Sequence, residues 1–426
     1  MWAQPWPELG TTYDIAAFEP VSPAVPGLRE TIFLGHGTNL LPGQPNEPVN
    51  FLGSGFAVAD VNGDGKNDLI AASSKSNVTG RNQAGSVWIW FGTGTTGMRD
   101  AADLLGAAPN VRILGADAED FMTWLEHGPD TNAVLNTGDC TGDGIADLVL
   151  HSSEASGPGN ARSRCGEAYL FFGKTTWPAL IDLANPTPAA KADVIIYGQS
   201  LDLLGQGTGG KMADLNGDNM AEVILYAPGR GDTLGRPDVG EVLLFPGRAA
   251  AAWPAVIDLA VAGSAGTRIL GPLAFDGIKS GVAQYGGVGV ADLNADGRND
   301  LILTAGDLSL TAARTSCGGA YLLFGKAVWP AVIDLETTTA APHASGINQS
   351  DKLGSTGVIL TGDCDGDGLR DLVLAADLAD GPANTRSGVG SGHLREPRPQ
   401  MPLPKHRPSS PRSPPPCSLR CWEMAV

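Results

Sequence analysis

The chain has 426 residues and carries 28 Lys and Arg against 46 Asp and Glu, which gives a formal net charge of −18. This excess of negative charge argues against nucleic acid and against anionic membrane surfaces as partners. No apolar run approaches the roughly 20 residues that a membrane-spanning helix needs, so we expect no direct membrane insertion.

The first residues form a segment without repeats. The chain begins Met1-Trp-Ala-Gln-Pro-Trp-Pro7, which lacks the basic n-region and the apolar h-region of a signal peptide. We expect residues 1–30 to be an N-terminal segment and residues 31–390 to be a repeat region.

Five acidic loops of nine residues recur in the repeat region, at residues 60–68, 139–147, 214–222, 292–300 and 363–371. Their first residues are 71 to 79 positions apart, and oxygen-bearing side chains stand at loop positions 1, 3, 5 and 9 in every loop. These residues are Asp60, Asn62, Asp64 and Asp68; Asp139, Thr141, Asp143 and Asp147; Asp214, Asn216, Asp218 and Glu222; Asp292, Asn294, Asp296 and Asp300; and Asp363, Asp365, Asp367 and Asp371.

This spacing is typical of a Ca2+ loop, because Ca2+ takes about six to eight oxygen ligands from a tight turn. We expect the backbone carbonyl of position 7 to add a ligand in each loop, from Lys66, Ile145, Met220, Arg298 and Leu369. Position 6 requires a positive φ, which Gly supplies in four loops and Asn219 in the third. The sequence therefore predicts up to five Ca2+ ions.

An EF-hand is the main alternative, since it begins with the same residue types but needs a Glu at position 12 and flanking helices. Position 12 is apolar in every loop, which excludes that reading; the residues are Ala71, Leu150, Leu225, Leu303 and Leu374. From the number of carboxylates, we expect the fifth loop to bind most tightly. The second loop should be weak because Thr141 stands at position 3, and the third weak or empty because it uses Glu222 and lacks Gly.

Each loop runs into an apolar strand, and a second strand follows that ends in Phe-Gly or a close variant, as at Phe91-Gly92, Phe172-Gly173 and Phe324-Gly325. A short strand such as Arg112-Ile-Leu-Gly115 precedes the next loop. About four short strands per repeat, without sustained helical periodicity, predict an all-β fold. Radially repeated four-stranded units indicate a β-propeller, with five repeats visible and the last one truncated.

The loops, the Phe-Gly strand ends and Ala227-Pro-Gly229 resemble the FG-GAP repeats of the integrin α-subunit propeller. The resemblance covers roughly residues 30–390 and implies a propeller in which Ca2+ is bound by some blades. Integrin-like propellers usually have seven blades, whereas five loops are found here. A repeated phrase, Trp-Pro-Ala-Leu/Val-Ile-Asp-Leu, begins at Trp177, Trp253 and Trp329 and looks more like bacterial secreted FG-GAP proteins.

The repeat pattern breaks near residue 391, where a strand ending in Phe-Gly is expected and a Pro- and Arg-rich sequence follows. We expect residues 391–426 to be a disordered tail, either from a shifted reading frame or as a genuine basic linker. The cysteines leave two options open. Cys140–Cys165 and Cys317–Cys364 can form disulfides, or all four can be free thiols.

Other motifs compete with the loops as sites. Arg230-Gly-Asp232 spells the tripeptide that integrins recognise, and its polar context predicts that it is exposed. The repeated Trp residues can stack on sugars or pack between blades, and packing is favoured beside Pro. Asn77 and Asn348 begin glycosylation sequons, so a glycoprotein is possible in a secretory pathway. No catalytic constellation is visible, and no enzyme activity is expected.

These patterns favour a calcium-binding, integrin-α-like propeller that serves as an extracellular or cell-surface adhesion or ligand-binding scaffold. Loop sites of this kind fill at extracellular Ca2+ concentrations, which supports that location. A protein or glycan ligand is expected on one rim of the propeller. The alternatives are a lectin-type propeller and the accessory propeller of a secreted hydrolase or lyase.

Overall fold

The computed structural model describes residues 52–92, 109–123, 135–206, 210–231, 239–261, 263–271, 287–311, 313–336, 344–355, 359–364, 366, 368–376, 378–379 and 391–394. The expected N-terminal segment 1–30 and residues 395–426 of the expected tail lie outside these residues. Within the described part the fold is all-β, with short 3-10 turns η2 (Pro158–Asn160) and η3 (Ala250–Ala252). No described helix is long and apolar enough to cross a membrane.

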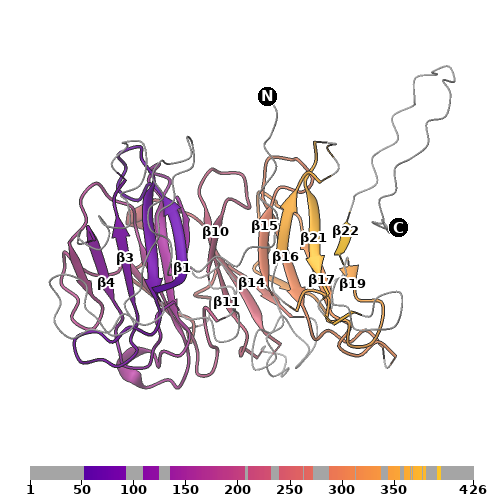
Figure 1. The fold of residues 1–426 in the computed structure, drawn as a ribbon, viewed down its shortest axis with the longest axis horizontal. Helices are drawn as coiled ribbons and strands as arrows, with labels where there is room; N and C mark the ends of the chain where they lie inside the picture. The colour runs from indigo at the N-terminus through magenta and orange to yellow at the C-terminus, as the bar shows by residue number, and fades with distance from the viewer. Residues whose placement is uncertain are drawn as a thin grey trace, which may run out of the picture.

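The strands form successive antiparallel blades (Figure 1). Blade 1 holds β1 (Leu52–Ala59), β2 (Asp68–Ser73), β3 (Ser86–Trp90) and β4 (Val111–Leu114); blade 2 holds β5 (Asn136–Gly138), β6 (Asp147–Ser152), β7 (Glu167–Phe171) and β9 (Val194–Tyr197). Blade 3 holds β10 (Lys211–Ala213), β11 (Glu222–Ala227), β12 (Glu241–Phe245) and β14 (Thr267–Leu270); blade 4 holds β15 (Val288–Ala291), β16 (Asp300–Ala305), β17 (Gly319–Leu323) and β19 (Ala344–Ser345). Blade 5 holds β20 (Ile359–Gly362), β21 (Asp371–Ala375) and β22 (Ser391–Leu394).

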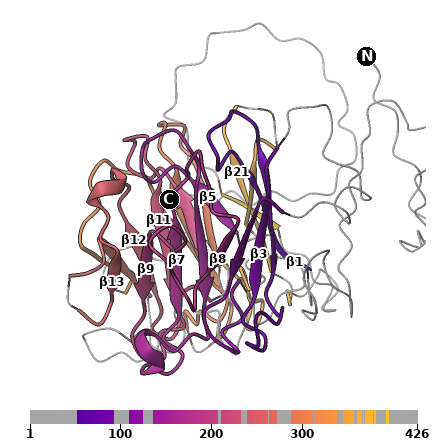
Figure 2. The same ribbon diagram turned by 90° about the vertical axis from the view of Figure 1, so that its left-hand side faces the viewer.

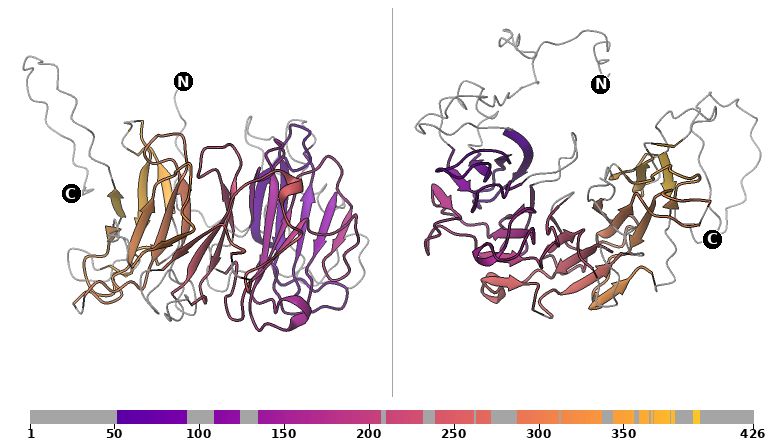
Figure 3. Two further views of the ribbon diagram at one scale, coloured as in Figure 1. Left: turned by 180° about the vertical axis from the view of Figure 1, so that it is seen from behind. Right: turned by 90° about the horizontal axis from the view of Figure 1, so that it is seen from below.

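The blades stack face to face along an arc, with blade 1 and blade 5 at opposite ends (Figure 3). Every residue of β2, β6, β11 and β16 is buried, as expected for a strand covered on both faces. One apolar cluster joins blades 1 and 2 through Ile89 and Phe171, and the next joins blades 2 and 3 through Leu170 and Phe245. The β-propeller type of fold predicted from the repeats is therefore confirmed.

A fifth strand extends each of the first three blades, and it comes from the following repeat. These strands are β8 (Leu180–Asp182), β13 (Val256–Asp258) and β18 (Val332–Asp334), which we call latch strands. Each pairs in parallel with the fourth strand of the preceding blade, as β13 does with β9 (Figure 2). A latch strand covers the outer edge of a sheet, which would otherwise offer unpaired backbone groups.

The repeated Trp-Pro-Ala-Leu/Val-Ile-Asp-Leu phrase encodes the latch strand. Its Ile is buried in all three copies, and the Asp of the first two copies pairs with Arg81 and Arg162, each with an N–O distance of 2.6 Å. Trp177 and Trp253 are only 8% and 7% exposed, and each donates its indole N–H to a backbone carbonyl at 2.9 Å. These two rings therefore pack within the fold, as favoured above, and expose little surface on which a sugar could stack.

The structure also tests the expected disulfides and the expected end of the repeat region. Cys140, Cys165, Cys317 and Cys364 are free thiols, so neither of the two possible disulfides is formed. Strand β22 pairs with β21 at the place where the Phe-Gly strand is expected, so pairing extends to Leu394, just beyond the boundary placed after residue 390.

Candidate metal-binding loops

Each acidic loop connects the first and second strands of its blade, and its position 1 carboxylate organises the turn. Asp60 accepts backbone hydrogen bonds from Gly63 at 2.7 Å, Asp64 at 3.2 Å and Gly65 at 2.8 Å. The same wrapping recurs around Asp139, Asp214, Asp292 and Asp363. The shared residue pattern thus produces one loop conformation in five blades.

Positive φ angles at positions 4 and 6 let the loop close. In the first loop Gly63 and Gly65 have φ values of 72° and 79°. Asn219 has φ 66° at position 6 of the third loop, which confirms that Asn replaces Gly there without changing the turn. Ala295 takes φ 57° at position 4 of the fourth loop, where the other loops have Gly.

Side-chain oxygens at positions 3 and 5 also accept backbone amides of the turn. Asn62 Oδ1 accepts the amide of Asp64 at 2.9 Å, and Asp64 Oδ1 accepts the amide of Lys66 at 3.0 Å. The second oxygen of Asp64 lies 3.2 Å from Lys66 Nζ at an exposed site. In the first loop, the side-chain oxygens at positions 1, 3 and 5 therefore all hold amides of the same turn.

Position 9 makes a contact that the sequence pattern did not predict. Asp68 is only 1% exposed; its Oδ2 accepts the amide of Val61 at 3.0 Å and its Oδ1 the amide of Gly92 at 2.9 Å. Asp147 and Asp300 bind the corresponding amides. The position 9 carboxylate thus ties its loop to the Phe-Gly strand end. The number of residues between position 9 and the Phe-Gly glycine is nearly constant among the repeats, and this spacing could have indicated the contact.

The third loop differs at this point. Glu222 accepts the amide of Leu215 and the side-chain amide of Asn216, each at 2.7 Å. Burial raises the pKa of the Glu222 carboxyl to about 7, and the charges of Asp218 and Asp214 add to the rise. The longer side chain therefore closes the loop on itself instead of on the Phe-Gly position.

The donor set fits Ca2+ by its chemistry, since positions 1, 3, 5, 7 and 9 supply carboxylate, amide or hydroxyl, and carbonyl oxygens. Among the described residues, no group of three His, Cys, Asp or Glu side chains is arranged as a ready metal cage. In each loop the position 1 carboxylate instead holds backbone amides. Asp365 and Asp367 of the fifth loop lie outside the described residues.

The Phe-Gly glycine is required by its contact with the loop. A Cβ on Gly173 would lie 2.7 Å from the carbonyl oxygen of Ala146 and 2.4 Å from a methyl carbon of Ile145. We expect Gly173→Ala to destabilise the protein by about 1–3 kcal/mol, measured by urea unfolding, because the loop must move. Gly362→Ala is the control, since nothing lies within 4 Å of its added Cβ. Equal effects of the two changes would contradict the role of the contact.

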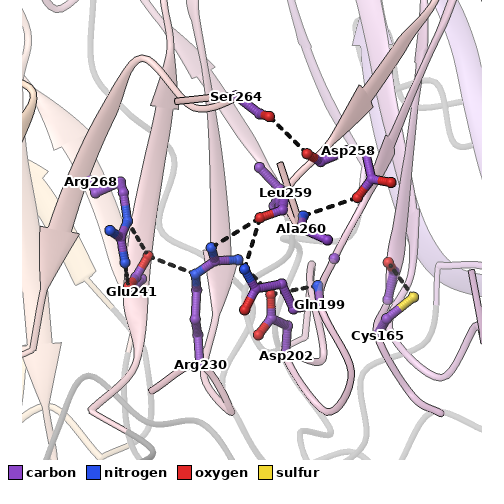
Figure 4. Close-up of polar contacts among 12 residues, drawn as sticks. Cys165, Gln199, Asp202, Arg230, Glu241, Asp258, Leu259, Ala260, Ser264 and Arg268 are labelled. Carbon is purple, nitrogen blue, oxygen red and sulfur yellow. Dashed lines mark hydrogen bonds and ion pairs between the residues drawn. The ribbon is translucent and has the colours of Figure 1, made fainter. Parts of the chain in front are cut away.

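The prediction that Arg230-Gly-Asp232 is exposed is wrong for the arginine. Arg230 is 7% exposed, and its guanidinium lies 2.6 Å from Asp202 and 3.0 Å from Glu241 (Figure 4). It also reaches the carbonyl of Leu259, while Glu241 binds Arg268 as well. Asp232 lies outside the described residues. Arg230 therefore links blades 2 and 3 and cannot serve as a recognition side chain in this conformation.

The fold and the loops place this chain in the class of β-propeller proteins in which an Asp-rich loop connects the first two strands of each blade. Within that class, residues 52–90, which span the first loop and the strands around it, match the FG-GAP repeat family. The chain is also 26% identical over 198 residues to a phosphatidylinositol-glycan-specific phospholipase D of Dictyostelium discoideum. That alignment takes in 45% of this chain but only 19% of the relative.

Three solved structures are similar at low sequence identity. An exotype rhamnogalacturonan lyase has a TM-score of 0.40 at 10% identity, over 84% of this chain and 51% of that one. A Bacillus licheniformis rhamnogalacturonan lyase has 0.39 at 12%, over 85% and 53%. An Agrocybe aegerita lectin specific for terminal N-acetylglucosamine has 0.33 at 15%, over 75% and 59%.

Proposed function

We propose that this chain is a calcium-binding β-propeller scaffold that acts outside the cell and presents its rim loops to a protein or glycan ligand in adhesion or ligand binding. The observation that carries the proposal is the recurrence of one loop conformation, with oxygen-bearing side chains at the same positions, in successive blades. Ordinary Asn/Asp/Gly turns do not keep such a pattern through an entire array.

The residues that would hold Ca2+ are the side chains at positions 1, 3, 5 and 9 and the carbonyl at position 7 of each loop. Bound Ca2+ would supply positive charge to loops that each concentrate several oxygen-bearing side chains within nine residues. The protein's part is to hold these oxygens on a turn that is fixed between two buried strands. Extracellular Ca2+ modules bind at about 10⁻⁴–10⁻³ M, so such loops fill outside the cell rather than in cytosol.

Chelation tests the proposal. Removing Ca2+ with EGTA should lower the free energy of unfolding by about 1.4 kcal/mol for each loop that was occupied at tenfold its Kd. Calorimetric melting in Ca2+, in EGTA and in Mg2+, all at one ionic strength set with NaCl, separates specific binding from charge screening. A melting curve that does not respond to EGTA would overturn the proposal.

A second candidate is that the chain is the accessory propeller of a secreted hydrolase. The named activity of the Dictyostelium discoideum relative favours it, since that protein is far longer than the aligned segment. The purified chain should then show no turnover of a glycosyl-phosphatidylinositol substrate by itself, but should bind it or its glycan. Turnover by the chain alone would contradict an accessory role. A glycan array tests the lectin alternative directly.

A further inference from the structure

Adjacent acidic loops are joined by backbone hydrogen bonds. The amide of position 8 donates to the carbonyl of position 1 in the preceding loop: Ala146 to Asp60 at 3.0 Å, Ala221 to Asp139 at 2.7 Å and Asn299 to Asp214 at 3.1 Å. The residue after each Phe-Gly position donates likewise to position 2 of the preceding loop, from Lys174 to Val61, Arg248 to Cys140 and Lys326 to Leu215. The first four loops thus form a continuous chain of contacts.

The donor in this chain belongs to the same peptide group as an expected metal ligand. The carbonyl of position 7 and the amide of position 8 are two ends of one planar peptide unit. In the second loop, that unit joins Ile145 to Ala146, whose amide reaches the carbonyl of Asp60. A cation on the carbonyl would polarise the N–H and strengthen its hydrogen bond, as neighbouring hydrogen bonds do in a chain.

The acceptor of this hydrogen bond is the backbone carbonyl of position 1, the residue whose carboxylate organises the preceding loop. Asp60, Asp139 and Asp214 each receive the amide of the next blade on their carbonyl while their carboxylates hold the turn. Ordering one loop therefore fixes the backbone of the residue on which the preceding loop is wound.

Side chains at position 7 add a second connection between the same loops. A Cβ on Gly63 would lie 2.8 Å from Ile145, and one on Gly142 would lie 2.9 Å from Met220. In the next pair, Arg298 packs against Gly217 and donates its Nε–H to the carbonyl of Asn216 at 3.1 Å. These side chains bridge the loops while the expected ligand at position 7 is only their backbone carbonyl.

We propose that the acidic loops of adjacent blades bind Ca2+ with positive cooperativity, transmitted through the peptide unit between positions 7 and 8 and through the position 7 side chain. This inference rests on the proposed calcium function and concerns how its sites act on one another. Coupling between two binding sites is reciprocal, so occupation of either loop of a pair strengthens the other. The array then orders as a unit, rather than blade by blade.

Calcium titration of the full chain by calorimetry and equilibrium dialysis tests this. The intact protein should give a Hill coefficient above 1. Asp143→Ala removes the position 5 carboxylate of the second loop, whose Oδ1 accepts only the amide of Ile145 within its turn. Besides losing one site, this variant should bind the remaining Ca2+ at least about fivefold more weakly, the lower end of typical coupling.

Arg298→Ala tests the connection in a different way, because it removes the bond to Asn216 and keeps the position 7 carbonyl. It should bind as many ions as the intact protein with a lower Hill coefficient. Arg164→Ala is the matched control, since Arg164 forms an exposed ion pair with Glu154 in the loop between the second and third strands, at the opposite end of the blade.

The outcomes distinguish a failure of the calcium function from a failure of the coupling alone. If no Ca2+ is bound, the proposed function fails. If Ca2+ is bound with a Hill coefficient of 1, and Asp143→Ala loses one site without weakening the others, the function stands and the coupling is refuted. Circular dichroism of each variant checks that it is folded.

Discussion

Arg230→Ala should lower the free energy of unfolding by about 3–5 kcal/mol, the usual cost of removing one partner from a buried ion pair. The side chains of Arg230, Asp202 and Glu241 are 8%, 4% and 0% exposed. Without the guanidinium, Asp202 keeps its backbone bond from Gln199 but loses its cation, and Glu241 keeps its ion pair with Arg268. Two buried acids would then lie between blades 2 and 3 without the positive charge of Arg230 that compensates both of them.

Urea unfolding at neutral pH measures this effect, and Arg164→Ala provides the comparison. That change also removes an arginine ion pair, but at a 45% exposed side chain, so it should cost at most about 1 kcal/mol. If both substitutions cost the same, burial does not determine the strength of the Arg230 contacts. The experiment also bears on recognition, because an exposed Arg230 would tolerate alanine.

Asp120→Asn should stabilise the protein above neutral pH by about 4 kcal/mol, because burial raises the pKa of the Asp120 carboxyl from 3.8 to about 7 and the charge of Glu167 adds to the rise. The folded protein keeps a proton that the unfolded chain releases between about pH 4 and pH 7. The stability connected with this group is therefore present at low pH and lost as pH rises through that window.

The neighbouring interface explains why Asp120 is exceptional. Asp202 lies in the corresponding turn of blade 2, and burial raises its pKa to about 6 while Arg230 opposes the rise. Between blades 1 and 2, the buried Ala155 stands in the place of Arg230. Each of these residues follows the first residue of its own acidic loop by the same number of positions in the sequence. Asp120 and Glu167 therefore face each other, with Tyr169 hydrogen-bonded to Glu167 and Asp117 and Glu154 nearby.

Unfolding curves of Asp120→Asn and the intact protein between pH 4 and pH 8.5 provide the measurement. The difference in stability should be small at pH 4 and grow toward pH 8. Glu119→Gln removes one negative charge from an exposed neighbour and controls for net charge. A constant difference across the range, or destabilisation at pH 8, would show that Asp120 is ionised in the folded protein at neutral pH.

Local patterns predicted the parts of this fold that are determined locally. The acidic loops, the buried strand after each of them and the φ of Asn219 follow from residue types at fixed spacing, and each is present as expected. The repeat period then gives the blade, because four short strands between turns can bury their apolar faces only against the next blade.

What the sequence could not predict depends on contacts between repeats. The latch strand looks like a continuation of its own repeat, but its partner lies one blade earlier, as β8 lies on β4. Arg230 stands among polar residues and is buried only because Asp202 and Glu241 meet there. Likewise, the inward contact of Asp68 depends on Gly92, a residue that another strand brings to the loop.

The latch strand also determines when the sheet of a blade can be completed during synthesis. Blade 1 has its first four strands once the ribosome has passed Leu114, but its fifth strand ends at Asp182. At about 5–20 residues per second, roughly 3–14 s pass before that strand can emerge. During this interval, the outer edge of the newest blade is open to pairing with another nascent chain. The second, third and fourth repeats therefore each protect the blade made before them, and slow translation within one of these repeats would lengthen the exposure of its predecessor.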